Sequence, residues 1–154
     1  MSDIYTQNFT EIHEPGGTLY PANRAANTYD TAWLPMRDHQ RIVFLVDVGV
    51  IAAGGTVDFE VRQATSVAGA GATNVFPNAG FIRMTQLTQA AGDGNDSVAV
   101  EVRTEQMDVD GGYAFLSGRL TVAVNTAYTC VIPLRLGTNY PPVPTTGWTE
   151  VVLS

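Results

Sequence analysis

Apolar and polar residues alternate along much of the chain beyond Trp33, which is the pattern of β-strands with one face in a core. Residues 56–63 are the clearest case, because Val57, Phe59 and Val61 share one face and charged side chains occupy the other. The same alternation predicts two further strands, each listed with its inward residues: Ser97–Thr104 (Val98, Val100, Val102) and Arg119–Val124 (Leu120, Val122, Val124).

Two other stretches are nearly continuous in apolar residues. Arg41–Val48 is rich in β-branched and aromatic side chains and predicts a central strand. Tyr128–Leu136 predicts an edge or bulged strand, since Pro133 cannot donate a hydrogen bond to a ladder. Weaker patterns predict strands at Phe81–Leu87, Tyr113–Leu116 and Trp148–Leu153, with a short helix between Asn78 and Ala91 as an alternative.

Turn residues separate these runs at intervals of eight to twenty residues, as at Gly54–Gly55, Gly92–Asp96 and Gly111–Gly112. No stretch sustains the 3.6-residue period of a helix. Antiparallel all-β domains have this spacing of strands and turns. The sequence therefore predicts an antiparallel β-sandwich or jelly-roll-like domain over residues 33–154.

Residues 1–32 differ from the rest because neither period is sustained there, and Pro15–Gly17 and Pro21 interrupt the stretch. We expect an irregular, extended N-terminal arm. Thirty extended residues reach on the order of 100 Å, far enough to contact a neighbouring subunit. The alternative is that the segment folds back and covers a sheet edge of its own domain.

The composition of the chain excludes several classes of function. Of 154 residues, 45% are hydrophobic and only 15% charged, which excludes disorder for the body of the chain. The net charge is −7, and all eight basic residues are arginine. We therefore expect neither nucleic acid nor an anionic membrane as a partner. The absence of lysine excludes Schiff-base and P-loop enzymes.

Candidate chemistry is sparse, and we expect no enzyme, cofactor or metal. Cys130 lies within an apolar run, where a small buried hydrophobe is the preferred interpretation, and His13 and His39 have no matching nucleophile motif. A pair of carboxylates acting on a glycoside stays open. The acidic stretches Asp93–Asp96 and Asp108–Asp110 lack the spacing of an EF-hand calcium loop, so we interpret them as turns and keep a calcium site as the alternative.

Aromatic and arginine side chains concentrate near the N-terminus of this charge-poor chain, and protein interfaces favour both types. The start of the sequence has no secretory signal pattern, so we expect the chain to be made in a cytoplasm and to stay soluble. Trp33 and Trp148 leave a sugar-stacking role open. The candidate interface residues are Tyr5, Phe9, Tyr20, Arg24, Tyr29, Trp33, Arg37, Tyr140 and Trp148.

The pattern of residues 33–135 resembles small head decoration, cement or minor capsid proteins of tailed bacteriophages. The stretches that carry the resemblance are Trp33–Pro35, Arg41–Leu45, Gly55–Ala64, Thr85–Thr88, Asp93–Asp96 and Val98–Arg103.

The resemblance implies a β-rich virion protein, made in the host cytoplasm, that binds the outer surface of the capsid and reinforces it. Its partners would be the major capsid protein and further copies of itself, as a homo-oligomer with a trimer favoured over a dimer. The resemblance supplies no catalytic residues. The alternative function is a carbohydrate-binding β-sandwich of a phage tail or receptor-binding structure.

Overall fold

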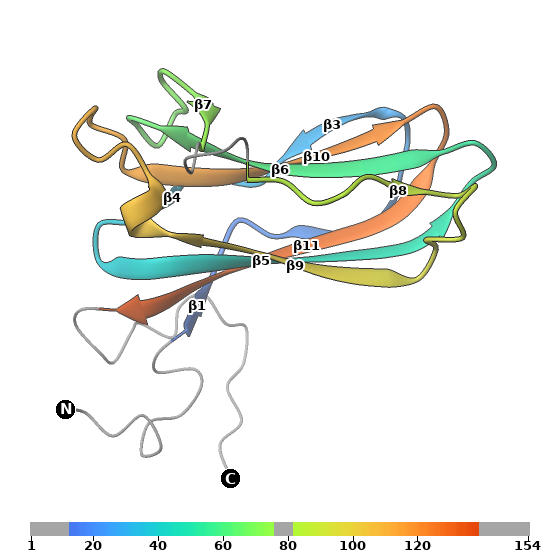
Figure 1. Ribbon diagram of the computed structural model, residues 1–154, viewed down its shortest axis with the longest axis horizontal. Coiled ribbons are helices and arrows are strands. Elements are labelled where there is room, and N and C mark those ends of the chain that lie inside the picture. The colour runs from blue at the N-terminus through green and yellow to red at the C-terminus, as the bar shows by residue number, and fades with distance from the viewer. Residues whose placement is uncertain (1–12, 76–81, 139–154) are drawn as a thin grey trace, which may run out of the picture.

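The structure, a computed structural model, describes residues 13–75 and 82–138 of the chain. Two antiparallel β-sheets lie face to face in two layers (Figure 1). The all-β sandwich predicted from the alternation of apolar and polar residues is therefore confirmed. Within the described residues, the one helical element is the 3₁₀ turn η2 (Thr104–Gln106).

Sheet A has five strands in the described residues and carries both long apolar runs. Its order is β1–β11–β5–β9, and β2 also pairs with β11 beyond the end of β1. The strands are β1 (His13–Pro15), β2 (Leu19–Arg24), β5 (His39–Ile51), β9 (Asp96–Arg103) and β11 (Ala127–Thr138).

Over the same part of the chain, sheet B has six strands in the order β3–β10–β6–β7, with β4 pairing to β10 and β8 pairing to β6. Its two long strands are neighbours, and the short ones flank them. The strands are β3 (Asn27–Asp30), β4 (Leu34–Pro35), β6 (Thr56–Ala64), β7 (Thr73–Asn74), β8 (Leu87–Thr88) and β10 (Phe115–Ala123).

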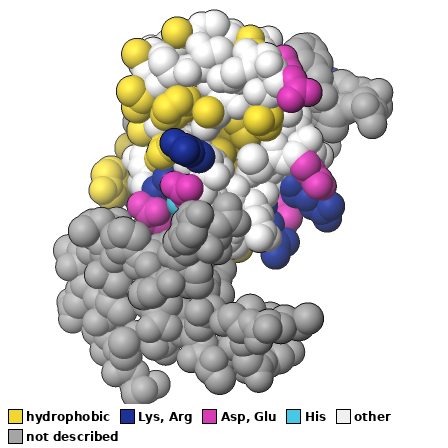
Figure 2. Space-filling model, turned by 90° about the vertical axis from the view of Figure 1, so that its left-hand side faces the viewer, with side chains coloured by type: hydrophobic (Ala, Val, Ile, Leu, Met, Phe, Trp, Pro, Cys, Tyr) yellow, Lys and Arg dark blue, Asp and Glu magenta, His cyan; other side chains and the backbone are white. Residues whose placement is uncertain are grey.

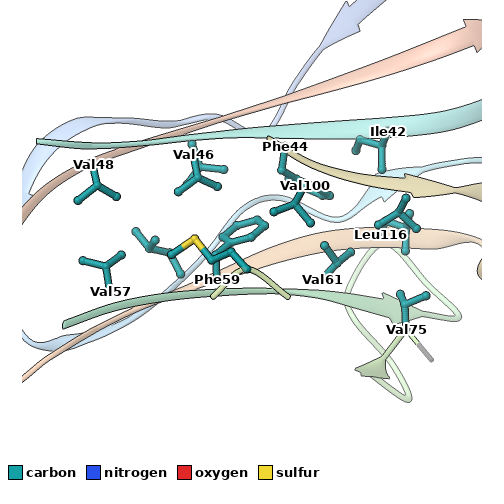
Figure 3. Packing of buried hydrophobic residues seen from close by; sticks show 14 of the residues in the cluster. Ile42, Phe44, Val46, Val48, Val57, Phe59, Val61, Val75, Val100 and Leu116 are labelled. Carbon is teal, nitrogen blue, oxygen red and sulfur yellow. The ribbon is translucent and has the colours of Figure 1, made fainter. Parts of the chain in front are cut away.

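The core fills the space between the sheets, where inward side chains from both layers interdigitate (Figure 3). Phe44 of β5 and Phe59 of β6 meet at its centre with ring centroids 5.4 Å apart and planes inclined at 54°. That tilted arrangement is favourable for aromatic pairs. Val57, Phe59 and Val61 are fully buried, as their alternation predicted.

Several details differ from the sequence expectation. One continuous strand, β10, replaces the two stretches expected at 113–116 and 119–124. Val124 was expected inward but is 78% exposed, because the strand ends at Ala123 and Val124 turns the chain with φ at +68°. In residues 82–91 the chain forms a bridge at Arg83 and the short β8, with no helix. Trp148–Leu153 lies outside the described residues.

The expected N-terminal arm is wrong for residues 13–30, which belong to the sandwich. β1 and β2 pair with β11 at one edge of sheet A, and β3 pairs with β10 in sheet B. The alternative of a segment that covers its own sheet edge describes them correctly. Short strands broken by turns at Gly16–Thr18 and Ala25–Ala26 do not sustain a period, which is why the pattern was irregular. Residues 1–12 lie outside the described part.

Pro133 lies in the interior of sheet A, not in an edge strand, because β11 has β5 on one side and β1 and β2 on the other. The carbonyl of Pro133 accepts from the Gly16 N–H at 3.3 Å, so its backbone polar atoms face away from β5. On that side Pro133 lies opposite the gap between β1 and β2. No strand there needs a hydrogen bond from residue 133, so the missing N–H of the proline destabilises the sheet little. The bulges of β11 fall at residues 127–131 instead.

Candidate protein-binding face

The outer face of sheet B is polar. On β6, Asp58, Glu60 and Arg62 point outward between the buried valines and Phe59. On β10, Arg119 forms a bidentate ion pair with Asp30 of β3, with both N···O distances 2.7 Å. Alternation with one wet face is normal for antiparallel sheets.

The outer face of sheet A is apolar over its two central strands. Ile42, Phe44 and Val46 of β5 point into the core, so the residues between them and their register partners on β11 point outward. Those partners pair directly, Val43 with Leu134 and Leu45 with Ile132. We call the outward, half-buried side chains the apolar face of sheet A: Val43, Leu45, Cys130, Ile132, Leu134 and Leu136.

An apolar face on an outer layer requires an explanation. Strands that are apolar on both sides are characteristic of sheets covered on both sides. β5 and β11 belong to a two-layer sandwich, so only one of their faces is covered by the other sheet. The continuous apolar run Arg41–Val48 is the sequence signal for this second face, although by itself it predicted only a central strand. The apolar face of sheet A is the candidate binding surface.

A groove crosses the end of this face beside β2. Its volume is about 410 Å³, and its walls are formed largely by apolar groups of Pro21, Ala22, Tyr128, Cys130 and Ile132. Tyr128 is 54% exposed, and Tyr20, next to Pro21, is 76% exposed. Exposed tyrosines beside an apolar groove are typical of protein interfaces.

Cys130 contributes surface to this groove rather than reactivity. Its side chain is half-buried on the apolar face, which corrects the expectation of a buried residue. Burial and the neighbouring carboxylate of Asp47 raise the pKa of the thiol. The thiolate, which is the nucleophile, is therefore disfavoured.

The acidic turns use their carboxylates to close the turns themselves. Asp93 Oδ2 accepts from the backbone N–H of Thr88 at 2.8 Å, and Asp108 Oδ1 accepts from that of Gly111 at 2.9 Å. Across residues 13–75 and 82–138, no group of three or more His, Cys, Asp and Glu side chains is arranged to hold a metal ion. Both loops are consistent with the interpretation as turns.

The structure brings together three of the candidate interface residues. Arg24 lies over the ring of Tyr29 at 5.1 Å from its centroid and donates to the carbonyl of Tyr20 at 2.7 Å. This cluster joins β2 to β3, where the chain passes from sheet A to sheet B. Only Tyr20 extends well into solvent, beside the groove.

The other candidates lie apart from this cluster. Trp33 is half-buried, and its indole packs so closely on Gly69 that a Cβ there would lie 2.5 Å from Nε1. Its ring therefore holds the 65–72 loop of its own chain. Arg37 is exposed at the opposite end of β5 from the groove. The remaining four, Tyr5, Phe9, Tyr140 and Trp148, are outside the described residues.

Arg37 belongs to a hollow of about 490 Å³ at the start of β5, which Arg41 and Arg103 also line. Figure 2 looks onto this end, where basic and acidic side chains lie close together. Arg41 pairs with Glu101 at 3.3 Å and Arg103 with Glu105 at 3.4 Å. These carboxylates offset the arginine charge, so the hollow does not present a strongly positive surface.

Beneath this end lies a buried polar cluster that no sequence pattern indicated. Arg135 of β11, 7% exposed, forms an ion pair with Glu14 of β1 at 2.7 Å and donates to the Pro35 carbonyl of sheet B at 3.1 Å. His39 Nε2 lies 3.5 Å from the other Glu14 oxygen, without a hydrogen bond. Arg135 therefore ties the two sheets together.

No family model and no curated protein matches the chain. None of the helices in the described ranges has the length and apolar character needed to cross a membrane.

Proposed function

We propose that this protein is a structural component of a virion that binds the outer surface of a phage capsid and reinforces it, without catalysis. The observation that carries the proposal is the apolar face of sheet A, which the other sheet does not cover. Binding would bury that face against the major capsid protein.

The residues around the apolar face of sheet A support a permanent contact with another protein. The face has charged residues at its margins, Arg41, Asp47 and Glu101, all exposed. An apolar centre with a charged rim is the usual anatomy of a protein interface. A protein that binds only the assembled shell stabilises the assembled state by mass action. Many modest contacts on one particle would add up through multivalency.

The experiment is co-sedimentation of the purified chain with heads assembled from the major capsid protein encoded in the same genome. Leu45→Arg places a charge at the centre of the apolar face. We expect it to weaken binding at least about thirtyfold, the ratio that corresponds to about 2 kcal/mol for a central interface residue.

The matched control is Thr121→Arg, which adds the same charge on the outer face of sheet B, opposite Asp58 in the register. We expect it to bind heads like the unmodified chain. Equal binding by both variants, or no binding of the unmodified chain to the heads, would overturn the proposal. The proposal would also be overturned if the genome that encodes this chain contained no gene for a major capsid protein.

A further inference from the structure

Three of the four sheet edges are built from short strands. One edge of sheet A consists of β1 and β2, three and six residues long, each containing a proline. The edges of sheet B consist of β3 and β4, and of β7 and β8, none longer than four residues. Short strands and prolines are the usual protection of an edge against pairing with another chain.

The fourth edge, β9, lacks that protection. It is eight residues long, Asp96–Arg103, and contains neither proline nor glycine. Among the strands of residues 13–75 and 82–138 it pairs only with β5, and its register with β5 is regular from end to end. No other backbone group of the described residues bonds to residues 97–102. An edge of this kind is a template for a further strand.

The direction of the free backbone groups follows from the end of β9. The Arg103 N–H donates to Gln106 Oε1 of its own chain at 2.8 Å, so Arg103 faces away from β5. Backbone groups alternate in direction along an antiparallel strand. The N–H and C=O groups of Ser97, Ala99 and Glu101 therefore point outward, and those of Val98 and Val100 point to β5.

We propose that β9 pairs antiparallel with β9 of a second copy of this chain, about a two-fold axis at Ala99. Ala99 then lies opposite its own copy, and Ser97 lies opposite Glu101 on both sides of the axis. These three pairs each exchange two backbone hydrogen bonds, about six in all. The two sheets A join into one sheet of ten strands, five from each copy.

The side chains favour this register over its neighbours. Ala99 is small and exposed, so its copy fits opposite it. Ser97 can donate to the Glu101 carboxylate. On the inner face, half-buried Val98 packs against Val100 of the second copy, which extends the core. A shift that centred the axis on Glu101 would set two carboxylates opposite each other, which is unfavourable.

The β9 dimer is one form of the self-association that the resemblance implies, but it does not depend on capsid binding, because the β9 edge and the apolar face of sheet A are different surfaces. It replaces the trimer expected from the resemblance with a two-fold dimer. A monomer that binds heads would overturn the inference alone, and a dimer that ignores heads would overturn the proposed function alone.

The first test measures molar mass by light scattering across a range of protein concentrations. The unmodified chain should have the mass of a dimer. Ala99→Pro removes the outward N–H at the axis without removing a bond to β5, and should give a monomer. If circular dichroism shows that the proline variant is unfolded, Ala99→Lys replaces it as the test. It places two like charges opposite each other and should also give a monomer. Its control, Ala90→Lys, changes an exposed turn residue and should leave the dimer intact.

The second test fixes the register by cross-linking in a Cys130→Ser background. Across the axis the two Ala99 Cα atoms should be about 5.5 Å apart, within the range a disulfide spans. Ala99→Cys should therefore form a covalent dimer on oxidation, and Ser97→Cys should not. A monomeric or trimeric unmodified chain, a dimer that survives Ala99→Lys, or cross-linking through position 97 and not 99 would overturn the inference.

Discussion

His39 is the residue whose chemistry depends most on its surroundings. It is 8% exposed and lies among three charged groups: Glu14 on β1, Arg135 on β11 and Asp38 beside it in sequence. Burial, and then the positive charge of Arg135, lower the pKa of His39 from 6.5, although Glu14 and Asp38 oppose the shift. The folded protein therefore favours the neutral imidazole.

Stability should consequently depend on pH through His39. Below pH 6.5 the imidazole binds a proton in the unfolded chain before it does so in the folded one. Folding stability is thus fully present above that pH and declines as the pH falls through 6.5 towards the lowered pKa. We expect the melting temperature of the unmodified chain to fall between about pH 8 and pH 5.5, where most carboxyl groups stay ionised.

His39→Gln should flatten this decline, because glutamine does not titrate. The control is His13→Gln, which changes the other histidine. Parallel curves for the unmodified chain and His39→Gln would show that His39 does not govern the pH dependence.

The role of Gly118 within its strand could not be predicted from the sequence. The strands expected at 113–116 and 119–124 leave Ser117 and Gly118 between them, but both residues lie inside β10. A Cβ on Gly118 would overlap the Phe59 ring and lie 3.1 Å from Cδ1 of Phe44. The glycine therefore makes room for the aromatic pair. The local sequence pattern cannot distinguish a glycine that ends a strand from one that leaves room for an aromatic ring of the neighbouring strand.

Gly118→Ala should destabilise the fold by about 1–3 kcal/mol, the usual cost of overpacking a dense core. Chemical denaturation measures the loss. Gly94→Ala is the control, because a Cβ there would lie 3.5 Å from the Gly49 carbonyl, an ordinary contact. It should change stability by less than about 0.5 kcal/mol. Equal effects of the two substitutions would contradict the packing role of Gly118.

For the whole molecule, the sequence predicted the strands that have a strong alternating or apolar pattern. It missed the strands that form only by pairing with distant parts of the chain. β5, β6, β9 and β11 were expected close to their observed positions because each is long and strongly patterned. β1, β2 and β3 were missed, since short strands acquire their structure from β10 and β11, far away in the sequence. The run Arg41–Val48 indicates a strand that is apolar on both faces. It predicts an uncovered apolar face only when the fold is known to have two layers.

The buried cluster at the start of β5 could not be predicted from the sequence for the same reason. Glu14 and Arg135 come from opposite ends of the described chain and meet because β1 and β11 pair in register. Glycine, proline and asparagine near Glu14 predicted irregular structure, and nothing in the local sequence of Arg135 distinguished it from a surface arginine. Their proximity is a property of the fold.

The N-terminal strands should therefore be required for folding, and truncation separates them from the residues before them. Deleting residues 2–12 retains every described strand, so we expect it to melt close to the full chain. Deleting residues 2–24 removes β1, β2 and Glu14, which leaves Arg135 as a buried charge without its partner. Breaking such a pair costs about 3 kcal/mol. At about 2 °C per kcal/mol for a chain of this size, the melting temperature should fall by at least about 6 °C.

Adding Arg135→Met to the longer truncation should recover part of this loss, because no buried charge then lacks a partner. Calorimetry on the two truncations and the combined variant measures all three values. If the 2–24 deletion melted like the full chain, β1 and β2 would be dispensable additions to a complete sandwich. The recovery from Arg135→Met then separates the two contributions: a full recovery would assign the loss to the ion pair, and a partial one would leave the remainder to the backbone pairing that β1 and β2 give β11.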